Sequence, residues 1–338
     1  MTNPDTTQAT TPPIEWPVSL QTIEAAAERI KPHVLRTPCV LSDSLSSSAH
    51  RVFLKLEHLQ TTGSFKLRGA THAIAQLPAA ARQRGVVGVS TGNHGRGLAY
   101  AAKQNGIQAV ICMGSLVPQN KIDGIAALGA DVRIVGNSQD EAQVEVDRLV
   151  AQQGMTLLPP FDHPHVISGQ GTLGLEILAD VPEVDTVIIP LSGGGLLAGI
   201  ACAVKALKPG VRIIGVTMER GCAMHQSLQA GKPVLVEELP SLADALGGGI
   251  GLDNQYTFAM TQALVDDTVL VTEAQIADAI AHAYWQEQQV LEGSGAVGIA
   301  ALQAGLIDQP GTTVILLSGR NIDMRLHQRV INGERPLL

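Results

Sequence analysis

One lysine of this sequence stands where a primary amine could do chemistry. Lys66 lies within Ser64-Phe65-Lys66-Leu67-Arg68-Gly69, after an alternating segment, Arg51–Leu56, and before apolar residues at helical spacing. These patterns predict a strand and then a helix, with Lys66 at the helix N-terminus. That end of a helix favours anions, so a cation there is unexpected. A solvated surface lysine would fit the same pattern, but a primary amine on a long arm can also condense with a carbonyl group.

Two loops of small residues could bind an anion. Ser90-Thr91-Gly92-Asn93-His94-Gly95 follows the apolar run 85–89, and Ser192-Gly193-Gly194-Gly195-Leu196-Leu197 follows the run 186–190. A helical pattern follows each loop, so unpaired backbone N–H groups gather at the helix N-terminus. Either loop alone could be a tight turn. The second loop contains no basic residue, so its backbone would have to hold the anion.

Five motifs together resemble one enzyme family. The lysine segment, the Gly92-Asn93-His94 loop and the Gly193-Gly194-Gly195-Leu196 loop occur in the family's order with Gly169-Gln170-Gly171-Thr172 and Leu317-Ser318-Gly319. From about residue 20 onward the chain resembles the threonine dehydratase and serine racemase group of pyridoxal-phosphate (PLP) enzymes, which have fold type II. The resemblance implies a two-domain α/β fold, a pyridoxal 5'-phosphate cofactor and an amino-acid substrate.

The resemblance also implies a role for each site residue. Lys66 would carry the cofactor as a Schiff base and take the substrate α-proton, while Phe65 would pack beside the ring and Asn93 would bind its hydroxyl. The phosphate would be cradled by Gly193, Gly194, Gly195, Leu196 and Leu197. Substrate binding would fall to Ser90, Thr91, Gly92, Asn93 and His94. Ser318 would face the ring nitrogen and leave it neutral, which favours elimination over transamination.

At several positions this sequence differs from the racemases, and these differences bear on which reaction the enzyme would catalyse. Thr91 stands where racemases have a serine that handles protons on the cofactor's opposite face, and β-branching fixes its rotamer. We keep Thr91 as a candidate acid or base but expect racemisation to be disfavoured. The acidic positions that bind a divalent cation in racemases correspond to Thr217 and Ala223, so no metal is predicted. No role is assigned to Glu219, Asp244 or Glu292.

The segments Met218–Gly221 and Asp244–Gly249 resemble the hydroxyectoine-utilisation dehydratases. That branch implies β-elimination of water from a hydroxylated N-acetyl-2,4-diaminobutyrate, followed by imine hydrolysis with release of ammonia. The acetyl group must be on the distal nitrogen, because an acylated α-amine cannot form the imine. A threonine, serine or 3-hydroxyaspartate dehydratase and a serine racemase-like enzyme are the alternatives within the group.

Two functions outside this group of enzymes remain as alternatives. Gly193–Ala198 also fits the dinucleotide pattern G-x-G-x-x-A, with Glu219 further on as a candidate ribose ligand, so an NAD-binding oxidoreductase is a rival. It leaves Lys66 and the Asn93 loop unexplained. A PLP-binding protein without turnover is the second rival, and Lys66, Asn93 and Ser318 together argue against it.

Composition agrees with a two-domain α/β enzyme. A chain of 338 residues with 45% hydrophobic content exceeds the usual size of one domain, and apolar strands alternate with helical patterns. A net charge of −8 argues against nucleic acid and anionic membranes as partners. Four dispersed cysteines fit a reducing cytoplasm, and family habit implies a homodimer. We predict a disordered tail at 1–17, a large cofactor-binding domain from 18–59 and 158–338, and a small domain at 60–157.

Overall fold

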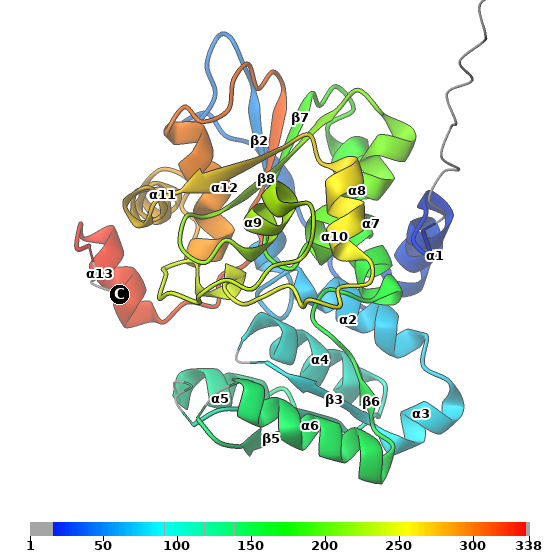
Figure 1. Ribbon diagram of the computed structural model, residues 1–338. Helices are drawn as coiled ribbons and strands as arrows, with labels where there is room; N and C mark the ends of the chain where they lie inside the picture. The colour runs from blue at the N-terminus through cyan, green and yellow to red at the C-terminus, as the bar shows by residue number, and fades with distance from the viewer. Residues whose placement is uncertain (1–15, 91, 116, 118, 138, 336–338) are drawn as a thin grey trace, which may run out of the picture.

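Strands and helices alternate along the chain in this computed structural model, which describes residues 16–335 except 91, 116, 118 and 138. Most of the predicted tail, residues 1–17, lies outside the described part. Two separate β-sheets organise the molecule. The larger lies in the upper part of Figure 1, and the smaller lies below it with the elements of residues 79–157. Their strands are parallel with one exception, which confirms the predicted α/β class.

The larger sheet has six strands. In spatial order these are β1 (Cys39–Leu41), β2 (Val52–Lys55), β10 (Thr313–Leu316), β7 (Thr186–Pro190), β8 (Arg212–Met218) and β9 (Asp267–Val271). Only β1 runs antiparallel, on β2. Side chains alternate between the two faces, so Ile188 packs with the core under α11 and α12 while Val187 and Ile189 pack with α7 and α8. Burial on both faces explains the continuous apolar run of β7, every residue of which is buried.

The smaller sheet has four parallel strands, in the order β5 (Asp131–Ile134), β4 (Ala109–Met113), β3 (Val86–Val89) and β6 (Thr156–Leu157). The same alternation operates here. Val86 and Ile111 face the core shared with α2 and α4, whereas Val87 and Val110 face α6. β1 and β6 are three and two residues long, and neither was predicted, because so short a run carries no periodic pattern.

The helices cover both faces of the two sheets, as Figure 1 shows. Around the smaller sheet they are α2 (Lys66–Ala75), α3 (Ala79–Arg84), α4 (Asn93–Gln104), α5 (Gln119–Ala126) and α6 (Gln139–Gln153). Around the larger sheet they are α1 (Leu20–Ile30), α7 (Pro164–Asp180), α8 (Gly195–Leu207), α9 (Ala223–Ala230), α10 (Thr257–Leu264), α11 (Glu273–Trp285), α12 (Gly293–Gln303) and α13 (Met324–Ile331). Two 3-10 turns, η1 (Glu57–Leu59) and η2 (Asp244–Leu246), complete the fold.

The Gly169-Gln170-Gly171-Thr172 motif brings α7 against α2. A side chain at Gly169 would place its Cβ 2.7 Å from the Cα of Gly69, so both glycines are needed for the helices to approach so closely. Gln170 then accepts a hydrogen bond from the Gly69 amide at 3.2 Å. This contact fixes α2, and therefore Lys66 at its first residue, against the larger sheet's helices.

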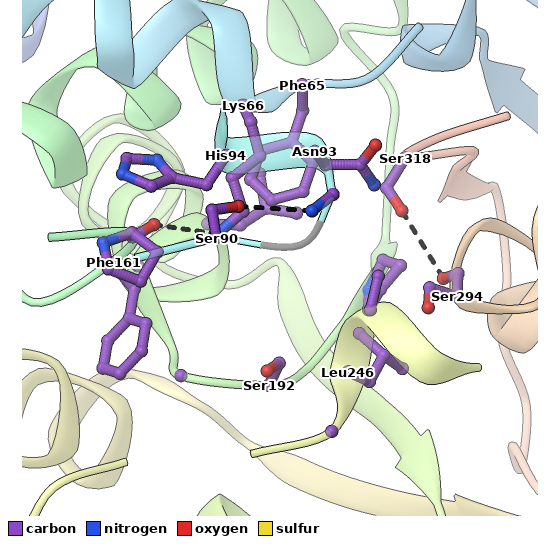
Figure 2. Close-up of a pocket in the computed structure, with 18 of the residues that line it drawn as sticks. Phe65, Lys66, Ser90, Asn93, His94, Phe161, Ser192, Leu246, Ser294 and Ser318 are labelled. Atoms are coloured by element: carbon purple, nitrogen blue, oxygen red, sulfur yellow. Dashed lines mark hydrogen bonds between the residues drawn. The ribbon is translucent and has the colours of Figure 1, made fainter. Parts of the chain in front are cut away.

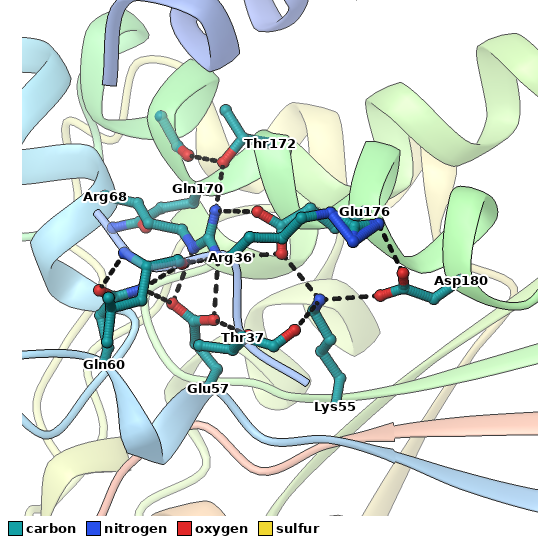
Figure 3. A network of polar contacts seen from close by, with 12 residues as sticks. Arg36, Thr37, Lys55, Glu57, Gln60, Arg68, Gln170, Thr172, Glu176 and Asp180 are labelled. Carbon is teal, nitrogen blue, oxygen red and sulfur yellow. Dashed lines mark hydrogen bonds and ion pairs between the residues drawn. The ribbon is translucent and has the colours of Figure 1, made fainter. Parts of the chain in front are cut away.

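A buried ionic network stabilises the same junction (Figure 3). The guanidinium of Arg68, 1% exposed, pairs with Glu57 from η1 at 2.7 Å and with Glu176 from α7 at 2.7 Å. Lys55 from β2 joins the network through ion pairs with Glu176 at 2.7 Å and with Asp180 at 3.0 Å. Because each buried charge has at least one opposite charge in contact, the network binds η1, α2 and α7 to one another without leaving an isolated ion.

Replacing Arg68 with methionine should strongly destabilise the protein. The change leaves Glu57 buried without its cation, and breaking a buried pair from one side costs about 3–5 kcal/mol. Urea unfolding followed by circular dichroism measures the loss. Arg148→Met is the control, because Arg148 pairs with Glu145 on the exposed surface of α6. An equal midpoint for the two variants would show that the network contributes nothing to stability.

Candidate active site

A cavity of about 190 Å³ lies where the carboxyl ends of strands from both sheets meet. Ser90 follows β3, Ser192 follows β7 and Ser318 follows β10, and all three line it. In parallel α/β sheets this edge is where ligands bind. Figure 2 shows Lys66 and Asn93 on one side of the cavity, with Ser192 on the opposite side. The structure therefore brings together four of the five motifs, namely the lysine segment, the Asn93 loop, the glycine loop and the segment of Ser318.

Lys66 is the first residue of α2, and its side chain lines the cavity. Its Nζ donates a hydrogen bond to the carbonyl of Pro160 at 2.8 Å and lies 5.2 Å from the centre of the Phe65 ring. Among the described residues no carboxylate pairs with it. Burial lowers the pKa of the Lys66 amine to about 8. The amine is thus far closer to its neutral, nucleophilic form at physiological pH than an ordinary lysine.

This pKa predicts how fast the apoenzyme takes up its cofactor. Only the neutral amine attacks an aldehyde, so the attachment rate should rise about tenfold per pH unit below pH ~8 and level off above it. A lysine with the ordinary pKa of 10.5 would keep accelerating past pH ~9. Absorbance after mixing apoenzyme with PLP measures the rate. A rate still rising steeply at pH ~10 would contradict the effect of burial.

The glycine loop presents free backbone amides at the N-terminus of α8. Gly194 caps the helix with φ +87°, a left-handed conformation that favours glycine, and no side chain caps the helix. The first helical bond runs from Ala198 to the Gly194 carbonyl, and within the described structure no acceptor takes the amides of 193–197. A Cβ at Gly193 would lie 2.3 Å from the ring of Phe161. The loop fits a phosphate dianion held by amides and the helix dipole.

Asn93 begins α4 and is held by two hydrogen bonds. Its Nδ2 donates to Glu292 Oε1 at 2.6 Å, and its Oδ1 accepts from Asn321 Nδ2 at 2.6 Å. Glu292 also accepts from the Asn321 amide at 3.1 Å. Burial first, and the nearby charge of Asp244 second, raise the pKa of Glu292 to about 7. Two of the four bonding positions of the Asn93 amide are thus fixed, and a donor remains for a ligand such as a ring hydroxyl.

Two serines, Ser318 after β10 and Ser294 in α12, are in contact at the cavity wall. Ser318 Oγ lies 3.4 Å from the Ser294 carbonyl, and Figure 2 shows the pair at the cavity wall. The hydroxyl of Ser294 is buried and lacks a hydrogen-bond partner in the described structure. A buried, unsatisfied hydroxyl is unfavourable unless a ligand completes it. No carboxylate takes part in this pair, so a ring nitrogen placed here would meet a hydroxyl rather than a charge.

The loop before α4 is held in place by hydrogen bonds to the side chain of Ser90. Ser90 Oγ accepts hydrogen bonds from the amides of Gly92 at 3.3 Å and Gly95 at 2.8 Å. The ring of His94 points to the Leu158 carbonyl at 2.8 Å, and burial first, with the charge of Lys66 second, lowers its pKa to about 4. With its ring neutral and bonded to the backbone, His94 can offer a substrate its main chain rather than its side chain. Thr91 lies outside the described residues.

Several cavity residues carried no motif in the sequence. They are Arg96, Lys121, Phe161, Glu292, Ser294 and Asn321. Lys121 of α5 pairs with Asp244 of η2 at 2.6 Å. For these residues the sequence offers one detectable signal, at the start of α12. There Glu292-Gly293-Ser294-Gly295 repeats the pattern of small residues that open a helix at the other two loops. The others reach the cavity only through tertiary folding.

The fold and this cavity define an enzyme that binds PLP. The chain belongs to the family described as "Pyridoxal-phosphate dependent enzyme", whose model matches residues 30–319. That span includes Lys66, the glycine loop and Ser318, so the predicted resemblance and the predicted cofactor are confirmed. The NAD alternative is not supported, because the same match accounts for the glycine loop.

The relatives narrow the class further. The chain is 61% identical over 94% of its length to a "Putative threonine dehydratase" of Sinorhizobium fredii, covering 96% of that protein. It is 42% identical over 93% of its length to the L-threonine ammonia-lyase of Thermotoga maritima, covering 78% of it. Maize serine racemase superposes with a TM-score of 0.88 at 33% identity, over 94% of this chain and 98% of the racemase. The chain is therefore a PLP-dependent lyase of the threonine dehydratase and serine racemase group.

Among the described residues no group of three or more His, Cys, Asp or Glu side chains could hold a metal ion. In the same part of the chain no helix is long and apolar enough to cross a membrane. His163, part of a His-x-His pattern, caps α7 and accepts a hydrogen bond from the His165 amide at 3.2 Å.

Proposed function

We propose that this enzyme removes water from a β-hydroxy amino acid, and that its substrate is a hydroxylated 2,4-diaminobutyrate acetylated on the distal nitrogen. The observation that carries the reaction type is the Ser318 hydroxyl after β10, which contacts the Ser294 carbonyl of α12 with no carboxylate taking part. A hydroxyl does not hold a pyridine nitrogen in its charged form. The names of the relatives, which act on threonine, support the same reaction.

In this proposal each side chain has a defined task. When bound, the cofactor withdraws electrons from the substrate carbon that loses its proton. Lys66 anchors the cofactor and, once displaced by the substrate amine, takes that proton with its neutral amine. Asn93, held by Glu292 and Asn321, fixes the ring, and the amides of 193–197 hold the phosphate. Loss of the β-hydroxyl as water leaves an enamine, which tautomerises and hydrolyses to a ketoacid and ammonia.

The substrate's distal group would reach the cavity rim formed by α5 and η2. Lys121 and Asp244 pair there at 2.6 Å, and both line the cavity. A neutral acetamide suits this rim because it can accept a hydrogen bond from the lysine and donate one to the carboxylate. Threonine, whose side chain ends in a methyl group, is the second candidate and is favoured by the relatives' names.

The experiment is ammonia release from a panel of substrates. It contains threonine, serine, 3-hydroxyaspartate and the isomers of distally acetylated hydroxy-2,4-diaminobutyrate, with chiral analysis to detect racemisation. We expect the highest kcat/KM for an acetylated isomer, with no enantiomer formed. Preference for threonine or serine would refute the substrate and leave the reaction class intact. Absence of ammonia with every compound would refute the reaction.

We further propose a cytoplasmic homodimer and a division into two domains. The larger domain would comprise 18–59 and 158–338, the smaller 60–157, and each would contain one of the two sheets. The cavity then lies between domains, which would allow it to close on a substrate.

A further inference from the structure

Three polar side chains that line the cavity form a hydrogen-bonded chain with a fixed direction. The side-chain nitrogen of Asn321 donates to the Thr62 carbonyl at 3.0 Å and to Asn93 Oδ1 at 2.6 Å. Asn93 Nδ2 in turn donates to Glu292 Oε1 at 2.6 Å. The Thr62 carbonyl can only accept a hydrogen bond, so it determines which end of the Asn321 amide faces it. Asn321 then determines the orientation of the Asn93 amide.

Glu292 imposes the same direction from the other end of the chain. Its Oε1 accepts from Asn93, and its Oε2 accepts from the backbone amide of Asn321 at 3.1 Å. A backbone amide can only donate, so both oxygens act as acceptors, and the ionised carboxylate is the form that satisfies both contacts. Glu292 is 4% exposed, and within the described part of the chain no lysine or arginine forms an ion pair with it. These two donors therefore hold the buried charge.

A glycine leaves room for this carboxylate. A Cβ built at Gly319 would lie 2.1 Å from Glu292 Oε1 and 3.3 Å from Asn93 Nδ2. The backbone of Gly319 does not adopt the left-handed conformation that favours glycine. The contact between Glu292 and Asn93 thus requires the small size of this residue rather than its backbone freedom.

We propose that Glu292 is a positioning residue, which turns the Asn93 amide so that its remaining N–H faces the ring oxygen of the bound cofactor. The inference rests on the part of the proposed function that places this ring oxygen on Asn93, and it does not depend on the substrate. An N–H donor stabilises the ring oxygen as an anion, whereas a carbonyl oxygen in its place would require the ring oxygen to keep its proton. Glu292 would thus favour the yellow form of the holoenzyme, in which that proton lies on the nitrogen joined to Lys66.

The absorbance of the PLP-saturated holoenzyme, without substrate, tests the proposal. Glutamine has one acceptor oxygen where the donors of Asn93 and Asn321 need two, so Glu292→Gln cannot satisfy both. We expect the ratio of yellow to near-ultraviolet absorbance, which compares the ionised with the protonated ring oxygen, to fall about 10- to 100-fold. Spectra are recorded at pH ~8.5, above the Glu292 pKa of about 7, where the wild-type carboxylate is ionised.

Glu287→Gln is the matched control for this substitution. The carboxylate of Glu287 accepts hydrogen bonds from the hydroxyls of Ser42 and Ser44, away from the cavity. A hydroxyl can either donate or accept, so an amide can replace the carboxylate there. The spectrum of this variant should equal that of the wild type.

A second variant reaches Glu292 from another segment of the chain. Gly319→Ala should push the carboxylate away from Asn93 and lower the yellow absorbance in the same direction as Glu292→Gln. Gly210→Ala is its control, because a Cβ there meets nothing within 4 Å, and it should leave the spectrum unchanged.

Asn93→Ala separates the ways in which the proposal could fail. It removes the contact to the ring oxygen itself, so it too should lose yellow absorbance. A normal spectrum for Glu292→Gln beside an altered one for Asn93→Ala would overturn the role of Glu292 alone. Normal spectra for both would also overturn the placement of the ring oxygen on Asn93. Because no substrate is present, a failure to release ammonia would refute only the proposed reaction.

Discussion

Lys66→Ala should lack the yellow colour of covalently bound cofactor and lose activity by about 10⁴-fold or more, because anchor and general base disappear together. The variant should still fold. The lost contacts are one hydrogen bond to the Pro160 carbonyl and packing beside Phe65, and the ionic network around Arg68 is untouched. Absorbance spectra of the purified protein and ammonia release measure the two effects.

Lys121→Met is the matched control for that experiment. Lys121 lines the same cavity, but its amine is paired with Asp244. We expect this variant to keep the cofactor's colour and to lose substrate affinity only. Full activity in Lys66→Ala, or loss of colour in Lys121→Met instead, would mean that the wrong lysine has been assigned.

Gly194→Ala should reduce cofactor affinity about 100-fold, since the cap that aims the loop's amides would have to rearrange and hydrogen bonds to a charged group would be lost. Gly194 has φ +87°, and its Cβ would lie 2.8 Å from Met224 Cε and 3.0 Å from Thr261 Oγ1. Titration of the apoenzyme with PLP gives the dissociation constant directly.

The variant Gly231→Ala distinguishes the effect of the glycine loop on PLP binding from the general effect of backbone strain. Gly231 caps α9 with φ +69°, and a Cβ there meets nothing within 4 Å. Placing an L-residue in the left-handed region costs about 1–2 kcal/mol at either position. The two variants should therefore share a loss of stability, while only Gly194→Ala binds PLP poorly. Equal PLP affinity in both would show that the loop does not hold the phosphate.

The local sequence was sufficient to predict the strands and helices whose own residues show a clear hydrophobic pattern. The apolar runs 85–89 and 186–190 form the strands β3 and β7, because burial on both faces of a sheet demands uninterrupted apolar residues there. Lys66, the Asn93 loop and the glycine loop could be found for the same reason, since each lies next to a strand end or a helix start that the pattern locates.

The other residues that line the cavity could not be predicted from local sequence patterns. Glu292 contacts Asn93 across 199 positions of sequence, and Asn321 contacts it across 228. Such groups acquire their roles from helix packing between distant segments, and a single sequence carries no periodic trace of that packing.

The most direct test of the central claim is chemical. Holoenzyme is reduced with borohydride, which makes the cofactor's bond to its lysine permanent, and is then digested and analysed by mass spectrometry. The account predicts the pyridoxyl phosphate adduct on the peptide containing Lys66 and on no other. An adduct on Lys55, Lys121 or another lysine, or an unmodified Lys66 in protein saturated with PLP, would contradict it.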